Sequence, residues 1–187
     1  MSCSRENSLD PARLKIVRAG KADIDELERI VNLAYRGGQA SVAWKNENHL
    51  VQGPRVTHED LHKHLESTES TILLLRSETG ELLGCVQIEH EPGESEAHIG
   101  MLTVHPEYQN YGLGRMLLQR AGDFAKNDLA CKKAKMCVFA GREELLAWYA
   151  KMGYEPTGEK MPFFGPESGL TPLVDNAHFV VVSKALV

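Results

Sequence analysis

The stretch QNYGLGR, residues 109–115, lies between an apolar run, HIGMLTV at 98–104, and a periodic segment that begins at Leu113. Its two glycines stand one residue apart just before the expected helix, where glycine lets a ligand approach the main chain closely. The free N–H groups and the positive dipole end of such a helix favour an anion. By itself the stretch predicts either a phosphate cradle or an ordinary turn.

The hydrophobic pattern around this stretch predicts alternating strands and helices. Strands are expected at 13–19, 70–78, 81–91, 96–104, 133–140 and 178–186. One further strand is expected shortly before the last one. Helices are expected at 21–37, 57–68, 113–129 and 142–153.

Two motifs carry a resemblance to a known family. The segment HIGMLTVHPEYQNYGLGRMLLQRAGDFA, with Gln-x-x-Gly-x-Gly at 109–114, resembles the acetyl-CoA-binding motif of the GNAT superfamily of N-acetyltransferases. Downstream, LLAWYAKMGYEP resembles the second signature of that superfamily, with Tyr149, Gly153 and Tyr154 at its characteristic positions. The order of the two motifs and of the expected elements matches the superfamily as well.

The resemblance implies an α/β (α+β) fold, the GNAT fold. Its central sheet would be mixed and mostly antiparallel, with about seven strands, about four flanking helices and two central strands that splay apart. We expect one domain over residues 13–187, preceded by a flexible arm at 1–12, because a chain of 187 residues can bury a single core.

The resemblance also implies acetyl-CoA as the acyl donor. The pantetheine arm would lie in the gap beside the strand that ends at Val104, bonded to the backbone of Leu102 and Val104. The pyrophosphate would rest on the N–H groups of 109–115, where Arg115 adds positive charge. The expected cofactor-binding residues are Leu102, Thr103, Val104, Gln109, Asn110, Tyr111, Gly112, Leu113, Gly114 and Arg115.

Acyl transfer to an amine needs a proton acceptor and a proton donor. Tyr149 matches the position of the family's general acid; the alternative is a half-buried aromatic side chain. His98 stands eleven residues before Gln109, where many relatives have a glutamate base. Glu96 shares its face by strand alternation, so the base is His98 or Glu96 unless both only line a solvated edge. The thioester carbonyl oxygen would accept a hydrogen bond from the N–H of Leu102.

The acceptor site is expected in the loop between the first two helices and in the loop before the last strand. Arg36 or Arg55 would bind a carboxylate, Trp44 would pack on an apolar or cationic part, and Phe163 would add the opposite wall. The alternative for each is a surface arginine or a core aromatic side chain.

Composition excludes several classes of function. A net charge of −5 argues against binding nucleic acid, and no apolar run is long enough to span a membrane. The four cysteines form no CxxC pair and none has an activating context in the sequence, which predicts reduced thiols and a cytoplasmic protein. HEDLH at 58–62 matches a zinc string, but without a third ligand we expect no metal.

These observations predict an acetyl-CoA-dependent N-acetyltransferase that acetylates a primary amine, by direct attack on the thioester. We favour a small-molecule amine over the alternatives, a peptide or protein lysine or N-terminal amine. A non-catalytic acyl-CoA-binding module is the alternative from another class. Homodimers are common in the superfamily, so a homodimer is an open expectation.

Overall fold

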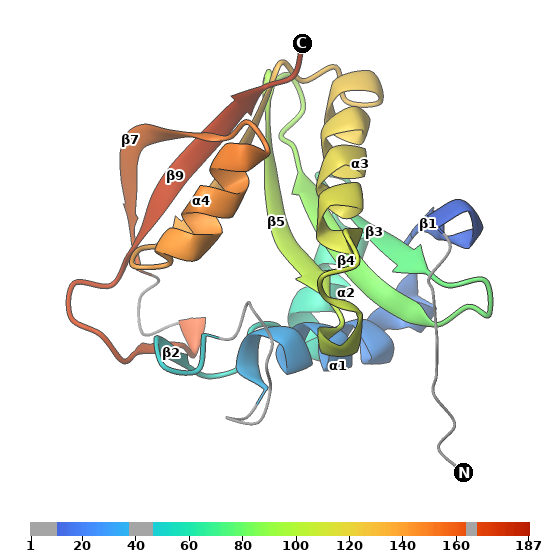
Figure 1. The fold of residues 1–187 in the computed structure, drawn as a ribbon, viewed down its shortest axis with the longest axis horizontal. Coiled ribbons are helices and arrows are strands. Elements are labelled where there is room, and N and C mark those ends of the chain that lie inside the picture. The colour runs from blue at the N-terminus through green and yellow to red at the C-terminus, as the bar shows by residue number, and fades with distance from the viewer. Residues whose placement is uncertain (1–10, 38–46, 164–167) are drawn as a thin grey trace.

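The computed structural model describes residues 11–37, 47–163 and 168–187, and its centre is a seven-stranded sheet (Figure 1). In their order across the sheet, the strands are β1 (Lys15–Arg18), β3 (Ser70–Arg76), β4 (Leu82–Glu89), β5 (Glu96–Val104), β6 (Lys133–Phe139), β9 (His178–Ala185) and β7 (Glu155–Pro162). A separate pair of short strands is formed by β2 (Val51–Gln52) and β8 (Thr171–Pro172).

Four α-helices and three short 3-10 helices occur in the described ranges. The α-helices are α1 (Ile24–Arg36), α2 (His58–Glu66), α3 (Leu113–Asn127) and α4 (Glu143–Lys151). The 3-10 helices are η1 (Pro11–Arg13), η2 (Lys21–Asp23) and η3 (Pro106–Tyr108). Within these ranges, no helix is long and apolar enough to cross a membrane.

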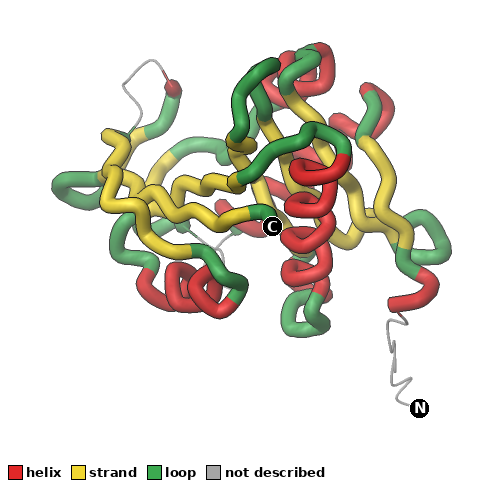
Figure 2. Tube along the Cα trace, turned by 90° about the horizontal axis from the view of Figure 1, so that it is seen from above, coloured by secondary structure: helices red, strands yellow, loops and turns green. Residues whose placement is uncertain are grey.

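Strand β3 is buried on both faces, and its alternate residues belong to two separate cores. Leu73 and Leu75 pack in the core that contains α3, whereas Ile72 and Leu74 pack in the core that contains α1 and α2. Successive side chains of a strand point to opposite faces, so helices must cover both faces of the sheet. Figure 2 shows helices on both sides of the strands.

Strands β5 and β6 run parallel, while every other neighbouring pair of the large sheet is antiparallel in the described residues. Their pairing ends at His98 and Lys135, although β5 continues to Val104 and β6 continues to Phe139. The two strands therefore splay apart beyond this point, and Figure 1 shows β5 diverging from β9 and β7.

The predicted fold class is confirmed, with a mixed and mostly antiparallel sheet of seven strands, four α-helices and splayed central strands. The pair of β2 and β8 was not predicted, because two-residue strands carry no periodicity. Residues 1–10 of the expected N-terminal arm lie outside the described residues.

Candidate functional site

The loop before α3 has the conformation of a cradle. Asn110 has φ 70° and Gly112 has φ 78°, and Gly112 caps the N-terminus of α3. A Cβ atom added at Gly112 would meet no other atom within 4 Å, so open space lies in front of this backbone. The first turn of α3, which is fully described, carries Arg115 and no acidic side chain. The loop therefore presents N–H groups, a helix dipole and one guanidinium to an anion.

A first cavity, of about 340 Å³, lies in front of this loop. Eight of the ten residues expected to bind the cofactor line it: Leu102, Val104, Gln109, Asn110, Gly112, Leu113, Gly114 and Arg115. The other two do not, because Tyr111 is exposed and the buried Thr103 hydroxyl donates to the carbonyl oxygen of Met101 at 3.0 Å. Trp148, which the sequence did not single out, lines the cavity from α4.

The backbone of Val104 faces the gap between the splayed strands. The N–H of His105 donates to the carbonyl oxygen of Leu83 on β4 at 2.8 Å. The backbone N–H and C=O of Val104, the residue before His105, therefore point away from β4. The Gln109 side-chain amide reaches the Val104 carbonyl oxygen from the loop, at 3.3 Å. This orientation is the one that a strand-like ligand in the gap requires.

A β-bulge lies in β5 beside the gap. Cys85 on β4 pairs with Thr103, but Gln87 pairs with Gly100, so β5 has one extra residue in this interval. Met101 within the bulge has φ 46°, in the left-handed region that side chains rarely adopt. The bulge turns the following residue, Leu102, into both cavities of the site.

The second cavity, of about 310 Å³, extends from Leu102 toward α1 and the loop after it. Five of the residues predicted for catalysis and acceptor binding line this cavity: Tyr149, His98, Arg36, Arg55 and Phe163. Trp44 lies outside the described residues, and Glu96 does not line it. The tertiary structure therefore collects side chains from α1, β5, α4 and two loops around one space.

Tyr149 is buried, with 3 % of its surface exposed. Burial raises the pKa of its phenol well above the usual 10, and nearby Tyr35 and Tyr154 act in the same direction. The proton therefore stays on the oxygen at neutral pH, which is the state that a general acid needs.

Tyr35 connects α1 with the bulged strand. Its buried hydroxyl donates a hydrogen bond to the carbonyl oxygen of Leu102 at 3.1 Å. Burial raises the pKa of this phenol to about 12, against the opposing effect of Arg55. Tyr35 thus holds the strand segment at which the two cavities meet.

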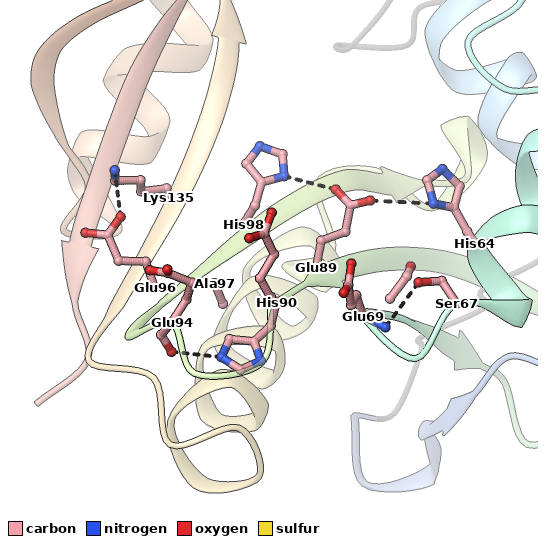
Figure 3. A pocket seen from close by; sticks show the side chains of 12 residues that line it. His64, Ser67, Glu69, Glu89, His90, Glu94, Glu96, Ala97, His98 and Lys135 are labelled. Carbon is pink, nitrogen blue, oxygen red and sulfur yellow. Dashed lines mark hydrogen bonds and ion pairs between the residues drawn. The ribbon is translucent and has the colours of Figure 1, made fainter.

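His98 lies in a row of titratable groups. Its Nδ1 is 3.4 Å from Oε2 of Glu89, whose Oε1 is 3.5 Å from Nδ1 of His64 (Figure 3). Burial disfavours the charged imidazole, but hydrogen bonds with Cys137 and Glu89 outweigh it and raise the pKa of His98 to about 9. Cys137, which has no activating context in the sequence, therefore contacts a candidate base.

Glu96 points away from His98 to two lysines. Its carboxylate is 2.7 Å from Nζ of Lys133 and 2.6 Å from Nζ of Lys135, and Figure 3 shows it turned toward Lys135. Hydrogen bonds with Lys133 and Lys135 lower the pKa of Glu96, so this carboxylate is a weak proton acceptor. Of the two candidate bases, the geometry favours His98.

Two arginines near the second cavity are held by Glu47. Arg36 donates to Glu47 at 3.1 Å and to the carbonyl oxygen of Gly53 at 2.8 Å. Arg142 is buried, pairs with Glu144 at 2.7 Å and lies 3.6 Å from Glu47. Arg142 does not line the first cavity.

Phe163 belongs to an aromatic cluster at the other end of the second cavity. Its ring stacks on Phe179 with centroids 6.0 Å apart and meets Phe139 edge to face at 5.8 Å. These aromatic rings make this part of the cavity lining apolar.

The HEDLH string lies on α2, where His58 is 3.5 Å from Asp25 and His62 is 3.3 Å from Glu66. Within the part of the chain that the structure describes, no three metal-ligating side chains are grouped to hold an ion.

Sequence reasoning missed four residues of the site: Glu89, Cys137, Tyr35 and Trp148. Glu89 pairs with His98 across β4 and β5, and Cys137 follows Lys135, the pairing partner of His98, by two positions on β6. Only a register would have identified these neighbours, and local patterns do not set the register of distant strands.

Comparisons with known proteins agree with this geometry. Residues 34–154 match the model of the acetyltransferase (GNAT) family. The curated proteins contain no match to the sequence.

Solved structures share the fold. A spermidine N-acetyltransferase from Vibrio cholerae in complex with CoA and spermine has a TM-score of 0.69 and 15 % identity, over 94 % of this chain and 96 % of that one. The spermidine/spermine N-acetyltransferase of Vibrio cholerae in complex with manganese ions has a TM-score of 0.65 and 15 % identity, over 94 % of each chain. Because the family model matches more than half of this chain, the chain belongs to the acetyltransferase (GNAT) family and is an acetyl-CoA-dependent N-acetyltransferase.

Proposed function

We propose that this enzyme acetylates a primary amine of a small molecule, by direct attack of the bound amine on the thioester of acetyl-CoA. The observation that carries the proposal is that two cavities meet at Leu102. One is lined by the anion cradle and the other by Tyr149 and His98. A pantetheine arm in the first cavity would bring its thioester to the junction, within reach of an amine in the second.

Each chemical step has a candidate group at this junction. The imidazole of His98 would take a proton from the amine, directly or through water. The buried phenol of Tyr149 would give a proton to the departing thiolate of CoA. A backbone N–H of the bulge, which we assign to Leu102, would hold the developing oxyanion.

The size of the second cavity supports a compact acceptor. About 310 Å³ is in the range of ordinary small-molecule sites, and the surrounding elements come from both ends of the chain. A peptide would need an extended groove instead. A structural neighbour binds spermine, which is a small-molecule amine.

An acceptor screen tests the proposal. The purified protein is incubated with acetyl-CoA and a broad panel of amines and lysine-containing peptides, and CoA release is measured together with product mass. We expect N-acetylated small molecules and little peptide acetylation. Efficient peptide acetylation would favour the protein-modifying alternative. Acetyl-CoA binding without any product would favour the non-catalytic binding module.

The cytoplasmic location and the homodimer remain predictions. Cys85, Cys131 and Cys137 form no disulfide with one another, which is consistent with a reducing compartment. Light scattering of the purified protein would give its oligomeric state, and a fluorescent fusion in the source cell would give its location.

A further inference from the structure

The charged groups that line the second cavity are mostly neutralised by one another. Arg36 pairs with Glu47 at 3.1 Å, and both side chains are almost buried. Glu89 lies between His98 and His64, and its hydrogen bond with His98 lowers the pKa of its carboxyl below the usual range. These carboxylates are therefore already engaged by side chains of the protein.

Arg55 differs from these groups. Within the described residues, its guanidinium has neither an ion pair nor a hydrogen-bond partner. It lies over the Tyr35 ring, whose centroid is 5.2 Å from Cζ, and its charge helps to lower the pKa of Glu89. Its position is nevertheless fixed, because the N–H groups of Arg55 and Val56 donate to Oδ1 of Asn32 at 2.7 and 3.3 Å. A held backbone with an unpaired, half-buried cation at a cavity wall is suited to bind an anion from outside the chain.

The position of Arg55 fits the acceptor and not the cofactor. The side chain lines the second cavity, whereas the anion cradle of 109–115 lines the first. Arg55 lies on the Tyr35 ring, and the hydroxyl of that same ring bonds to Leu102 at the junction. An anion on Arg55 is therefore separated from the reaction centre by roughly the length of one tyrosine side chain.

The rest of the cavity has two further features. One is the pair of His98 and Glu89, which offers a proton acceptor for an amine. The other is the apolar cluster of Phe139, Phe163 and Phe179. The positive wall matches a carboxylate, the proton-accepting wall matches an amino group, and the apolar wall matches an apolar side chain of the same molecule.

We propose that the acceptor is an amine that also carries a carboxylate, an amino acid with an apolar side chain, and that Arg55 binds this carboxylate. The proposal rests on the proposed function and names its substrate class. A polyamine fits this cavity less well, since its additional positive charges would meet Arg55 and find the cavity carboxylates already paired.

The first test uses the parent enzyme at saturating acetyl-CoA. kcat/KM is compared for L-leucine and L-phenylalanine, for their carboxamides and for spermidine. We expect kcat/KM for the acids to exceed kcat/KM for the amides by about 10- to 100-fold, the usual value of a charge-assisted Arg–carboxylate contact. Amidation also lowers the pKa of the amine, which makes the amide the readier nucleophile, so a preference for the acid has to come from binding.

The second test changes Arg55. Arg55→Gln should raise KM for the acids and remove their advantage over the amides, while kcat changes little. Arg55→Lys should retain part of the preference, and Arg55→Glu should shift it toward the amides and spermidine. Arg29→Gln, at an exposed position on α1, removes the same charge and should leave the preference unchanged. Thermal denaturation establishes that each variant is folded.

The outcomes separate the two proposals. Equal or better turnover of amides and spermidine by the parent enzyme overturns the assignment of Arg55 and leaves the acetylation of small amines standing. An equal loss for acids and amides in Arg55→Gln would make Arg55 a structural residue and would also overturn it. Failure of the parent enzyme to acetylate any amine would contradict the proposed function itself.

Discussion

Oε2 of Glu89 lies 3.4 Å from Nδ1 of His98, and the two residues are direct partners in the pairing of β4 with β5. The other oxygen of the same carboxylate is 3.5 Å from Nδ1 of His64 (Figure 3). A carboxylate on Nδ1 orients the imidazole, so Glu89 is a positioning residue for the proposed base.

Glu89→Gln should move the pH dependence of the reaction. His98 accepts a proton only when neutral, so with its pKa at about 9 the rate should rise as pH increases toward that value. Removing the Glu89 charge lowers the pKa of His98, and the midpoint of the rise should move to lower pH. The measurement is kcat/KM against pH for parent and variant on one amine, because the titration of the amine is then common to both profiles.

The control for this prediction is His98→Gln. This variant should lose the part of the increase in kcat/KM with pH that comes from deprotonation of His98. A profile that is the same in the parent enzyme and in both variants would show that His98 is not the base.

Tyr149→Phe should lose turnover and keep acetyl-CoA. The ring stays in the core, with its edge-to-face contacts to Trp148 and Tyr154, while the hydroxyl group that would donate the proton is removed. We expect kcat to fall by about 100-fold or more, the usual contribution of a general acid. Calorimetry with acetyl-CoA should give an affinity close to that of the parent enzyme, and unchanged kcat would contradict the role of Tyr149.

Gly112→Ala should weaken the binding of acetyl-CoA. The residue has φ 78°, where a Cβ atom costs about 1–2 kcal/mol, and the added methyl group would also enter the space in front of the cradle. We expect lower stability together with an affinity reduced by about tenfold or more.

Gly80→Ala is the matched control for that variant. Gly80 has φ 90° in the turn between β3 and β4, and a Cβ atom there also meets nothing within 4 Å. This substitution should lower the melting temperature without changing the affinity for acetyl-CoA. Equal losses of affinity in both variants would show that strain alone explains the effect at Gly112.

Cys137→Ala distinguishes direct attack from a covalent route. The thiol hydrogen-bonds with His98, which would suit a nucleophile, although its sulfur also lies 3.4 Å from the sulfur of Met161. Under direct attack the variant should retain turnover, and its pH profile should move to lower pH because one interaction that raises the pKa of His98 is gone. Loss of turnover, with an acetyl group found on the parent protein by intact mass, would refute direct attack.

The helices and strands of this protein were predictable because they depend on local pattern. β5 (Glu96–Val104) has the predicted bounds, and β6, α4 and β9 lie within a residue or two of theirs. The cradle at 109–115 was predictable for a similar reason, since a strand, a glycine loop and a helix in succession need only adjacent residues.

The partners of the charged side chains were not predictable in this way. From the sequence, Arg36 and Arg55 were equal candidates for binding a carboxylate, and either His98 or Glu96 could be the base. The structure distinguishes the two arginines, because Arg36 pairs with Glu47 whereas Arg55 has no ion pair among the described residues. It also distinguishes the two candidate bases, because Glu96 pairs with Lys133 and His98 with Glu89.

The sequence by itself thus determined the helices and strands, through its short-range periodicity. Its two motifs, through their resemblance to the GNAT superfamily, determined the fold class and the acetyl donor. The tertiary structure alone decided which of the candidate site residues meet. The register of β4 with β5 joins Glu89 to His98, and the bulge at Met101 brings Leu102 to both cavities. Both depend on contacts between residues far apart in the chain, which no local pattern specifies.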